Sequence, residues 1–219
     1  FYDGDGMKLL NEFGQKFNIH ALPGGNTGTQ MGGWFRKEIK EPSDFQGLKF
    51  RIGGWAGKTI EKLGGVPQQI AGGDIYQALE KGTIDAAEWV GPHDDEKLGL
   101  QRVAKYYYYP GWWEGAAALH FFINTAKWNS LPKPYQAILT AAAALANVEM
   151  QARYDARNPV ALRKLLNSGA ELRPFSEATM DACLKASNEV NAEAAAANAD
   201  FKKLYESMIS FRNAEYIWW

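Results

Sequence analysis

The fold is decided by the stretch GLKFRIGGWAGKTIEKLGGVPQQIAGGDIYQALEKGTIDAAEWV, residues 47–90 of the chain. Apolar and polar residues alternate at its start, which is typical of a strand, and helical spacing follows. The expected elements are strands at 47–52, 67–70 and 83–90 and helices at 55–63 and 74–80. Short strands and helices in alternation predict an α/β domain.

The flanking segments extend this pattern in both directions. The elements expected before and after it are a helix at 6–18, a strand at 19–22, a loop at 23–28, a strand at 34–39, and extended segments at 106–113 and 116–124. Beyond Pro132 the spacing is helical over 135–166 and again from 177 to about 211. The last third of the chain is therefore expected to be α-helical.

Composition excludes several classes of protein. The 219 residues, 46% of them hydrophobic, suit one large domain or two small ones. A formal net charge of -1 leaves no bulk field to attract nucleic acid or an anionic membrane, and the most apolar stretch, 137–148, is too short to span a bilayer. Residues 1–6 lack a secretion-signal pattern and an initiator Met, so we expect the chain to begin within a protein or after processing. Cys183 is the only cysteine, which excludes an internal disulfide.

A glycine-rich segment, GGWAGKT at 53–59, follows a predicted strand and opens a predicted helix, as a phosphate-binding P-loop would. The P-loop motif requires a glycine at position 52, where this chain has Ile52. A P-loop-like nucleotide-binding enzyme therefore stands only as an alternative function.

Acidic and nucleophilic side chains indicate no catalytic centre. The segment HDDE at 93–96 could suggest a metal site, but it follows Gly91-Pro92, where the first turn of a helix favours negative charge. We expect helix capping there. The three histidines are scattered, and no serine or cysteine lies in a nucleophile motif, so nucleophilic catalysis is not predicted.

A few charged residues lie in unusually apolar surroundings. Arg51 lies inside an otherwise apolar strand pattern, and Glu88 and Glu114 have aromatic neighbours in the sequence. A buried arginine needs a carboxylate or several acceptors, and a buried carboxylate needs a cation. Arg51 is therefore a candidate anion anchor, and a shared metal ion would serve both acids. The equally open alternative is a structural ion pair between Arg51 and one of them.

Several longer segments recur in the same order in a known family. They are QMGGWFRKEI (30–39), DFQGLKFR (44–51), GDIYQALEKGTIDAAEW (73–89), FFIN (121–124), WNSLP (128–132) and FRNAEYIWW (211–219). Together they resemble the DctP-type family of TRAP transporter solute-binding proteins, over essentially the whole chain. The resemblance is strongest for the branch that binds 2-oxo acids such as pyruvate, or lactate, with a metal ion.

The resemblance implies a two-lobed, type II-like periplasmic binding protein of the α/β class with long C-terminal helices. We expect the remainder of the first lobe and a crossing segment at 1–34, the second α/β lobe at 35–120, and a return to the first lobe with the hinge and C-terminal helices at 121–219. By this resemblance, we expect the sequence to lack much of the first lobe. We also expect it to lack a C-terminal helix that, in the branch it resembles most, is exchanged between the subunits of a dimer.

The resemblance also implies ligand contacts. Arg51 matches an arginine that grips the ligand carboxylate in two-point recognition. Gln30, Glu88 and Glu114 match residues that offer side-chain oxygens to a metal ion, and Trp89 matches one that offers its backbone carbonyl. Oxygen ligands favour sodium or calcium over zinc. Further expected contacts are aromatic, for which core packing is at least as good an explanation: Trp112, Tyr108 and Phe122.

The implied function is a non-enzymatic one. The protein would capture a small 2-oxo or 2-hydroxy monocarboxylate in the periplasm and deliver it to the membrane permease subunits of a TRAP transporter. A homodimer through the C-terminal helix is a further expectation. The rival classes are the nucleotide-binding enzyme, which a turnover assay tests, and a structural interaction module, which a ligand-binding assay tests.

Overall fold

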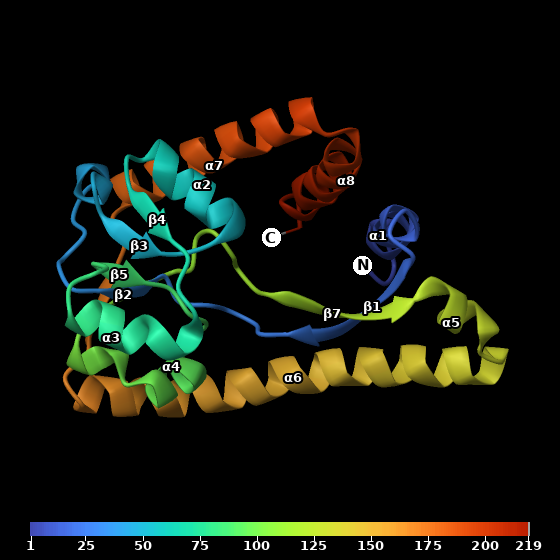
Figure 1. Ribbon diagram of the computed structural model, residues 1–219, viewed down its shortest axis with the longest axis horizontal. Coiled ribbons are helices and arrows are strands. Elements are labelled where there is room, and N and C mark those ends of the chain that lie inside the picture. The colour runs from blue at the N-terminus through green and yellow to red at the C-terminus, as the bar shows by residue number, and fades with distance from the viewer. Residues whose placement is uncertain (219) are drawn as a thin grey trace. The chain divides into compact units, whose positions relative to one another are not determined.

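The computed structural model describes residues 1–218 and divides the chain into two compact units (Figure 1). The first unit comprises Phe1–Asn26, Ala118–Gln151 and the chain from Asn191 onward, and the second comprises Thr27–Ala117 and Ala152–Val190. Residues 152–190, which we grouped with the first lobe, thus cluster with the second unit. Trp219, the last residue of the resembling segment 211–219, lies outside the described residues.

The first unit contains an antiparallel pair of strands, β1 (Ile19–Asn26) and β7 (Ala118–Asn124). β1 is longer than predicted, because the glycine-rich residues expected as a loop pair with β7, with a register shift around Gly24. A Cβ at Gly24 would lie 2.2 Å from the ring of Phe121, so the strand needs glycine at this point. The glycines therefore bend the strand instead of ending it.

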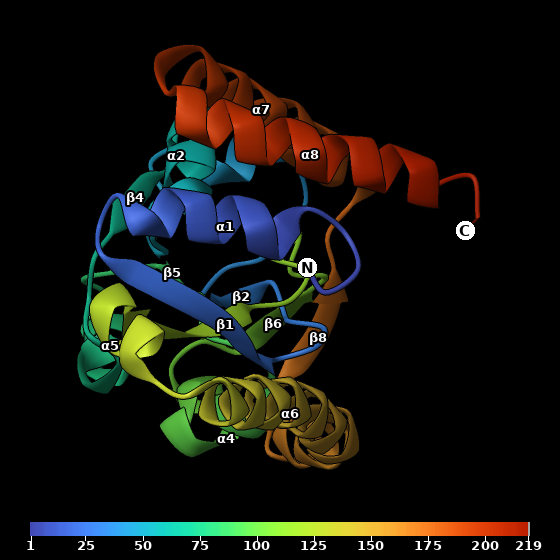
Figure 2. The same cartoon turned by 90° about the vertical axis from the view of Figure 1, so that its right-hand side faces the viewer.

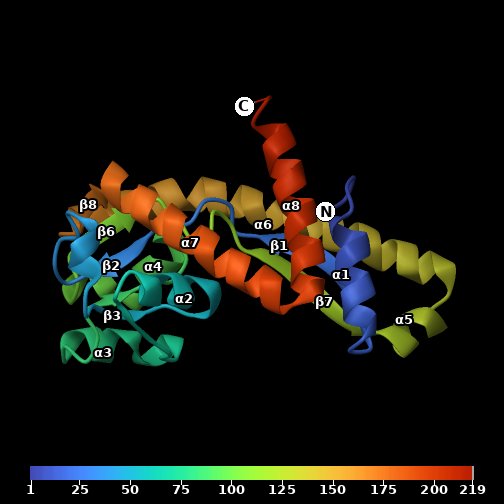
Figure 3. The same ribbon diagram turned by 90° about the horizontal axis from the view of Figure 1, so that it is seen from above.

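Helices α1 (Gly6–Gln15), α5 (Thr125–Ser130) and α8 (Ala199–Glu215) belong to the same unit. Figure 2 shows α1 along β1, and Figure 3 shows α8 beside α1. Two ion pairs connect α8 with the α1 segment: Lys16–Asp200 and Lys203–Glu12. Both pairs are largely exposed, so each contributes little to stability.

The second unit contains a six-stranded sheet in the order β4-β3-β5-β2-β6-β8. Its strands are β2 (Gly33–Phe35), β3 (Lys49–Arg51), β4 (Val66–Gln68), β5 (Ala86–Ala87), β6 (Tyr106–Tyr109) and β8 (Glu171–Pro174). β3 runs parallel to β4 and β5, and β6 runs parallel to β8, whereas β2 is antiparallel to its neighbours β5 and β6. This mixed sheet with its helices confirms the predicted α/β class.

Both faces of this sheet pack against helices, because successive side chains of a strand point to opposite faces. The helices between the strands are α2 (Gly54–Lys62), α3 (Ile75–Glu80) and α4 (Pro92–Leu98). Phe35 and Phe50 pack with Ile60 of α2, whereas Trp34 packs with Leu79 of α3. Figure 1 shows α2 and α3 on opposite sides of the strands.

Two longer helices follow, α6 (Lys133–Asn167) and α7 (Glu177–Ala197). The single helix predicted from 177 to about 211 is interrupted at Asn198. Its side chain accepts hydrogen bonds from the N–H groups of Asp200 and Phe201, so it caps α8 instead of continuing α7. Within residues 1–218, no helix combines the length and the apolar character needed to cross a bilayer.

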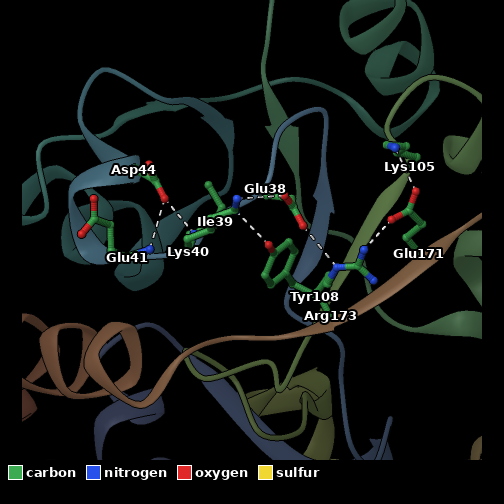
Figure 4. Close-up of polar contacts among 9 residues, drawn as sticks. All are labelled: Glu38, Ile39, Lys40, Glu41, Asp44, Lys105, Tyr108, Glu171 and Arg173. Carbon is green, nitrogen blue, oxygen red and sulfur yellow. Dashed lines mark hydrogen bonds and ion pairs between the residues drawn. The ribbon is translucent and has the colours of Figure 1, made fainter.

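Charged side chains line the sheet near its β8 edge (Figure 4). Glu171 pairs with Lys105 at 2.8 Å and also with Arg173, which reaches Glu38 at 3.4 Å. These contacts link β8 to β6 and to the segment that follows β2. Since the partners are about one-third exposed or more, the pairs contribute modestly to stability.

Candidate functional site

The carboxyl ends of three strands meet at one edge of the sheet in the second unit. β3 is parallel to β5, and β2 is antiparallel to both β5 and β6, so β3, β5 and β6 end at the edge where β2 begins. Arg51 is the last residue of β3, Glu88 follows β5, Glu114 follows β6 after a short loop, and Gln30 precedes β2. Ligands of open α/β sheets bind outside the carboxyl ends of strands, which makes this edge the candidate site.

Backbone hydrogen bonds hold these segments side by side. The N–H of Gly111 donates to the carbonyl of Gln30 at 3.1 Å, and the N–H of Met31 donates to the carbonyl of Val90 at 3.1 Å. A Cβ at Gly111 would lie 3.0 Å from the carbonyl oxygen of Gln30, so the close approach favours glycine. The segment containing Gln30 therefore lies between the ends of β5 and β6.

Arg51 uses only part of its hydrogen-bonding capacity within the protein. Its Nε donates to the carbonyl of Ile70 at 3.2 Å, and its Nη1 donates to the carbonyl and to the carboxylate of Glu88, at 2.7 and 3.3 Å. The guanidinium also lies 5.2 Å from the centre of the Trp89 ring. Nη2 donates to no residue among 1–218, so one side of the planar fork remains for a ligand carboxylate.

Glu88 is a largely buried carboxylate, with its side chain 14% exposed. Burial raises its pKa to about 7; the Arg51 charge lowers the pKa, and the charges of Glu114 and Asp95 raise it further. The pairing with Arg51 that the sequence left open as an alternative is present at 3.3 Å. It engages one carboxylate oxygen only, and no residue among 1–218 donates to the other. The carboxylate is thus incompletely paired.

Gln30 is 3% exposed, and only one end of its side-chain amide is hydrogen-bonded within the described chain. Its Nε2 donates to Oγ1 of Thr27 at 3.0 Å. Its Oε1 is buried and has no hydrogen-bond partner within the described chain. A buried acceptor without a partner costs about 1–3 kcal/mol, so a cation or donor at this point would stabilise the protein.

The oxygens of Gln30, Glu88 and Glu114 suit a hard cation, because sodium and calcium prefer oxygen ligands. The effect of Glu114 on the pKa of Glu88 places the two carboxylates within electrostatic reach of each other. No group of three or more His, Cys, Asp or Glu in residues 1–218 is placed to hold a metal ion. A metal at this edge therefore depends on amide and backbone oxygens as well, which fits sodium or calcium and not zinc.

The three aromatic residues predicted to contact the ligand lie in different surroundings. Trp112 is half-buried, lies edge-on to Trp113 at 4.8 Å, and has a buried Nε1 without a partner among residues 1–218. Tyr108 is 2% exposed, stacks on Phe175, and accepts a backbone hydrogen bond through its hydroxyl (Figure 4). It packs in the core, as the alternative above described. Phe122 belongs to β7 of the first unit and is 68% exposed.

The glycine-rich segment 53–59 does not form a P-loop. Ile52, where the motif requires glycine, is 1% exposed and packs in the core. Gly57 and Lys58 lie inside α2 instead of ending a loop, and the Lys58 ammonium lies over the Trp55 ring at 4.6 Å. The nucleotide-binding alternative therefore has no structural support.

Our sequence reasoning missed one buried carboxylate, Asp95. It lies in the first turn of α4, as predicted for the acids at 93–96, and accepts from the N–H groups of Val90 and Gly91 at 3.2 and 3.1 Å. It also accepts from Nε1 of Trp34 at 3.0 Å and from the hydroxyl of Tyr107 at 2.7 Å, and is 1% exposed. Trp34 and Tyr107 could have indicated a buried acceptor, since buried Trp and Tyr side chains rarely leave their N–H and O–H groups unpaired.

Residues 1–198 match the DctP family, described as bacterial extracellular solute-binding protein, family 7. A monocarboxylate 2-oxoacid-binding periplasmic protein of Nostoc sp. is 48% identical over 217 residues, which are 99% of this chain and 60% of that protein. The chain thus spans well under two-thirds of the length of this relative.

Solved structures of similar proteins share the fold. A TRAP transporter solute binding protein from Bordetella bronchiseptica, a mixed-occupancy dimer with copurified calcium and picolinate, is 51% identical with a TM-score of 0.93, over 98% of this chain and 64% of that one. A TRAP periplasmic solute binding protein from Pseudoalteromonas atlantica with bound sodium and pyruvate is 41% identical with a TM-score of 0.92, over 100% and 67%. With the family match covering most of its length, this chain belongs to the DctP family of bacterial extracellular solute-binding proteins.

Proposed function

We propose that this protein is the periplasmic solute-binding protein of a TRAP transporter and captures a small 2-oxo or 2-hydroxy monocarboxylate together with sodium or calcium. The observation that carries the proposal is the free side of the Arg51 guanidinium next to the incompletely paired carboxylate of Glu88. A carboxylate ligand would complete the hydrogen bonds of the arginine, and a cation would complete those of the acid.

The chemistry of the donor set supports an acid with a second oxygen on C2. Gln30, Glu88, Glu114 and the carbonyl of Trp89 would hold the cation, and none of them is a soft ligand. When bound, the cation supplies positive charge that offsets the carboxylates and accepts oxygen donors from the ligand. A 2-oxo or 2-hydroxy acid has an oxygen next to its carboxylate to offer, whereas a plain monocarboxylate does not. The former should therefore bind more tightly.

The similar proteins support the ligand class and the partners. The Nostoc protein is named for 2-oxoacids, and the two solved structures contain sodium with pyruvate and calcium with picolinate. By this similarity, the protein would work in the periplasm, hand its ligand to TRAP permease subunits and carry out no turnover. The dimer of the Bordetella bronchiseptica protein supports a homodimer as a further part of the proposal.

Ligand binding to the purified protein tests the proposal. We expect pyruvate and lactate, with sodium or calcium, to raise the melting temperature, because a ligand that binds only the folded state stabilises it. Propionate should have a smaller effect, and prior chelation should weaken the response to pyruvate. An unchanged melting temperature with every acid and both cations would contradict the proposal.

A substitution at Arg51 tests how the carboxylate is held. Arg51→Lys keeps the charge and loses the planar fork, so we expect pyruvate affinity to fall about tenfold or more, roughly 1.4 kcal/mol. Arg36→Lys is the matched control, because Arg36 is a partly exposed arginine of the same unit that pairs with Asp85 at 3.9 Å. Calorimetry that gives equal pyruvate affinity for wild type and Arg51→Lys would assign Arg51 a structural role only.

A further inference from the structure

The hydroxyl of Thr27 has its hydrogen-bonding capacity fully used. Thr27 is 5% exposed, and its Oγ1 donates to the carbonyl of Gly28 at 3.1 Å. The same oxygen accepts from the N–H of Ala117 at 2.9 Å and from the side chain of Gln30 at 3.0 Å. A hydroxyl has one hydrogen to donate and two lone pairs to accept with. The hydrogen is committed to Gly28, so Thr27 can only accept from Gln30.

This arrangement decides which end of the Gln30 amide faces Thr27 and which end is left unpaired. Only the NH₂ end of an amide can donate, so Nε2 must face Thr27 and Oε1 must point the other way. Oε1 is buried there without a partner among residues 1–218. Gln30 itself lies between the ends of β5 and β6, where Glu88 and Glu114 follow. The orientation therefore leaves an oxygen, and not two N–H groups, unpaired in the segment that lies between the ends of β5 and β6.

We propose that Thr27 is a positioning residue for cation binding, which holds the Gln30 amide with its oxygen toward the ion. The inference rests on the proposed function. Without the hydroxyl, the amide can turn and present its NH₂ end, whose partial positive charge opposes a cation. The hydroxyl also accepts from the backbone N–H of Ala117.

Calcium binding to the chelator-treated protein, measured by calorimetry well below the melting temperature, tests this role. Thr27→Val keeps the size and removes the hydroxyl, and we expect the calcium affinity to fall about tenfold, which is about 1.4 kcal/mol. Thr27→Ser keeps the hydroxyl and should restore the affinity to within about twofold of wild type. Loss of affinity in both variants, or in neither, would overturn the inference.

A second background separates positioning from a general structural effect. Gln30→Glu places an oxygen at both ends of the side chain, so its orientation no longer matters to the ion. In this background we expect Thr27→Val to change calcium affinity by less than about threefold. A purely structural role of Thr27 would reduce calcium affinity equally in both backgrounds, and that result would refute positioning. Gln30→Ala provides the same comparison if the added charge prevents folding, because no amide remains to orient.

Failure of this inference and failure of the proposed function give different results. If wild type binds no calcium and its pyruvate response is indifferent to cations, the metal part of the proposed function is wrong, and Thr27 has no ion to serve. If wild type binds calcium and Thr27→Val binds it equally well, the function stands and the positioning role is wrong.

Discussion

Glu88 and Asp95 are two buried carboxylates in the same unit, and they are satisfied to very different degrees. Asp95 accepts from Trp34, Tyr107 and two backbone N–H groups, so its oxygens are well supplied with donors. Glu88 has a single side-chain contact, to Arg51 at 3.3 Å, and is repelled by Glu114. Burial is costly for both carboxylates, so the two differ in which groups satisfy their oxygens.

The comparison distinguishes a structural acid from a binding acid. Protein groups satisfy the hydrogen bonds of Asp95. Through them, Asp95 links the backbone that follows β5 to the aromatic residues of the core. Glu88 lies only a few residues earlier, at the edge where β3, β5 and β6 end. It lacks hydrogen-bond partners among residues 1–218 on one oxygen, and a bound cation could take their place. A well-satisfied carboxylate thus follows an under-satisfied one in the chain, close enough for its charge to raise the pKa of Glu88. Rigid support of this kind is what a preorganised binding site requires.

The largest expected effect comes from removing the structural acid. Asp95→Ala leaves the indole of Trp34, the hydroxyl of Tyr107 and two backbone N–H groups without their acceptor in a buried place. We expect the free energy of unfolding to fall by about 3–5 kcal/mol, measured by urea denaturation.

Asp94→Ala is the matched control for this experiment. Asp94 is the neighbouring acid, its side chain is 22% exposed, and it contacts Tyr154 and Lys97 near the surface. We expect a loss of about 1 kcal/mol, since exposed charge pairs contribute little. Equal losses for the two variants would contradict the structural role assigned to Asp95.

A pH dependence of stability is the next largest effect. Burial raises the pKa of Asp95 to about 6 from an ordinary value of 3.8, and the hydrogen bonds from Tyr107 and Trp34 offset part of the rise. The folded state thus holds the proton more tightly than the unfolded state. This contribution to stability is fully present below pH 3.8 and is lost as pH rises through 6, a change of about 3 kcal/mol.

Urea denaturation of wild type and Asp95→Asn between pH 4 and pH 7 checks this expectation. Wild type should lose stability relative to the variant as pH rises, because the amide of the variant does not titrate. A difference in unfolding free energy that stays constant over this range would show that the four donors hold the pKa of Asp95 at its ordinary value.

The sequence predicts the sheet of the second unit well and its details less well. The alternating pattern over 47–90 was sufficient for the α/β class, because each strand and helix there is separated by glycines. The strand expected at 83–90 is reduced to Ala86–Ala87, and the glycines near Gly24 bend β1 instead of ending it. Whether a glycine ends or bends a strand depends on what packs against it, and here that is Phe121, which is distant in sequence.

The candidate site was predictable only in part. Arg51 stands out because an arginine in an apolar strand needs a partner, and the structure supplies one in Glu88. The run of tyrosines in β6 places Tyr107 and Tyr108 on opposite faces of a strand, but nothing in it indicates that both faces are buried. The same holds for adjacent Asp94 and Asp95, of which only the latter is fully buried. The saturated hydroxyl of Thr27 depends on partners that the sequence does not reveal.

The smallest expected effect on stability comes from the binding acid, and it decides between the interpretations of Arg51. Glu88→Gln keeps the size of the side chain and removes a buried charge that Glu114 repels. We expect the unfolding free energy of the metal-free protein to change by less than about 0.5 kcal/mol at pH 8, while calcium affinity falls about tenfold. Glu114→Gln should reduce calcium affinity less, because Glu114 is exposed and its charge is better screened.

Acid binding provides the final distinction, because the coupling between metal and ligand is reciprocal. If calcium and pyruvate share a site, Glu88→Gln should weaken pyruvate binding only as far as it weakens calcium binding. In the presence of chelator, Glu88→Gln and wild type should then bind pyruvate with the same affinity. If Glu88 serves mainly to neutralise Arg51, its replacement leaves a buried guanidinium without its carboxylate. In that case the metal-free protein would lose more than about 1 kcal/mol of unfolding free energy, calcium affinity would be unchanged, and the ligand would be held by Arg51 alone.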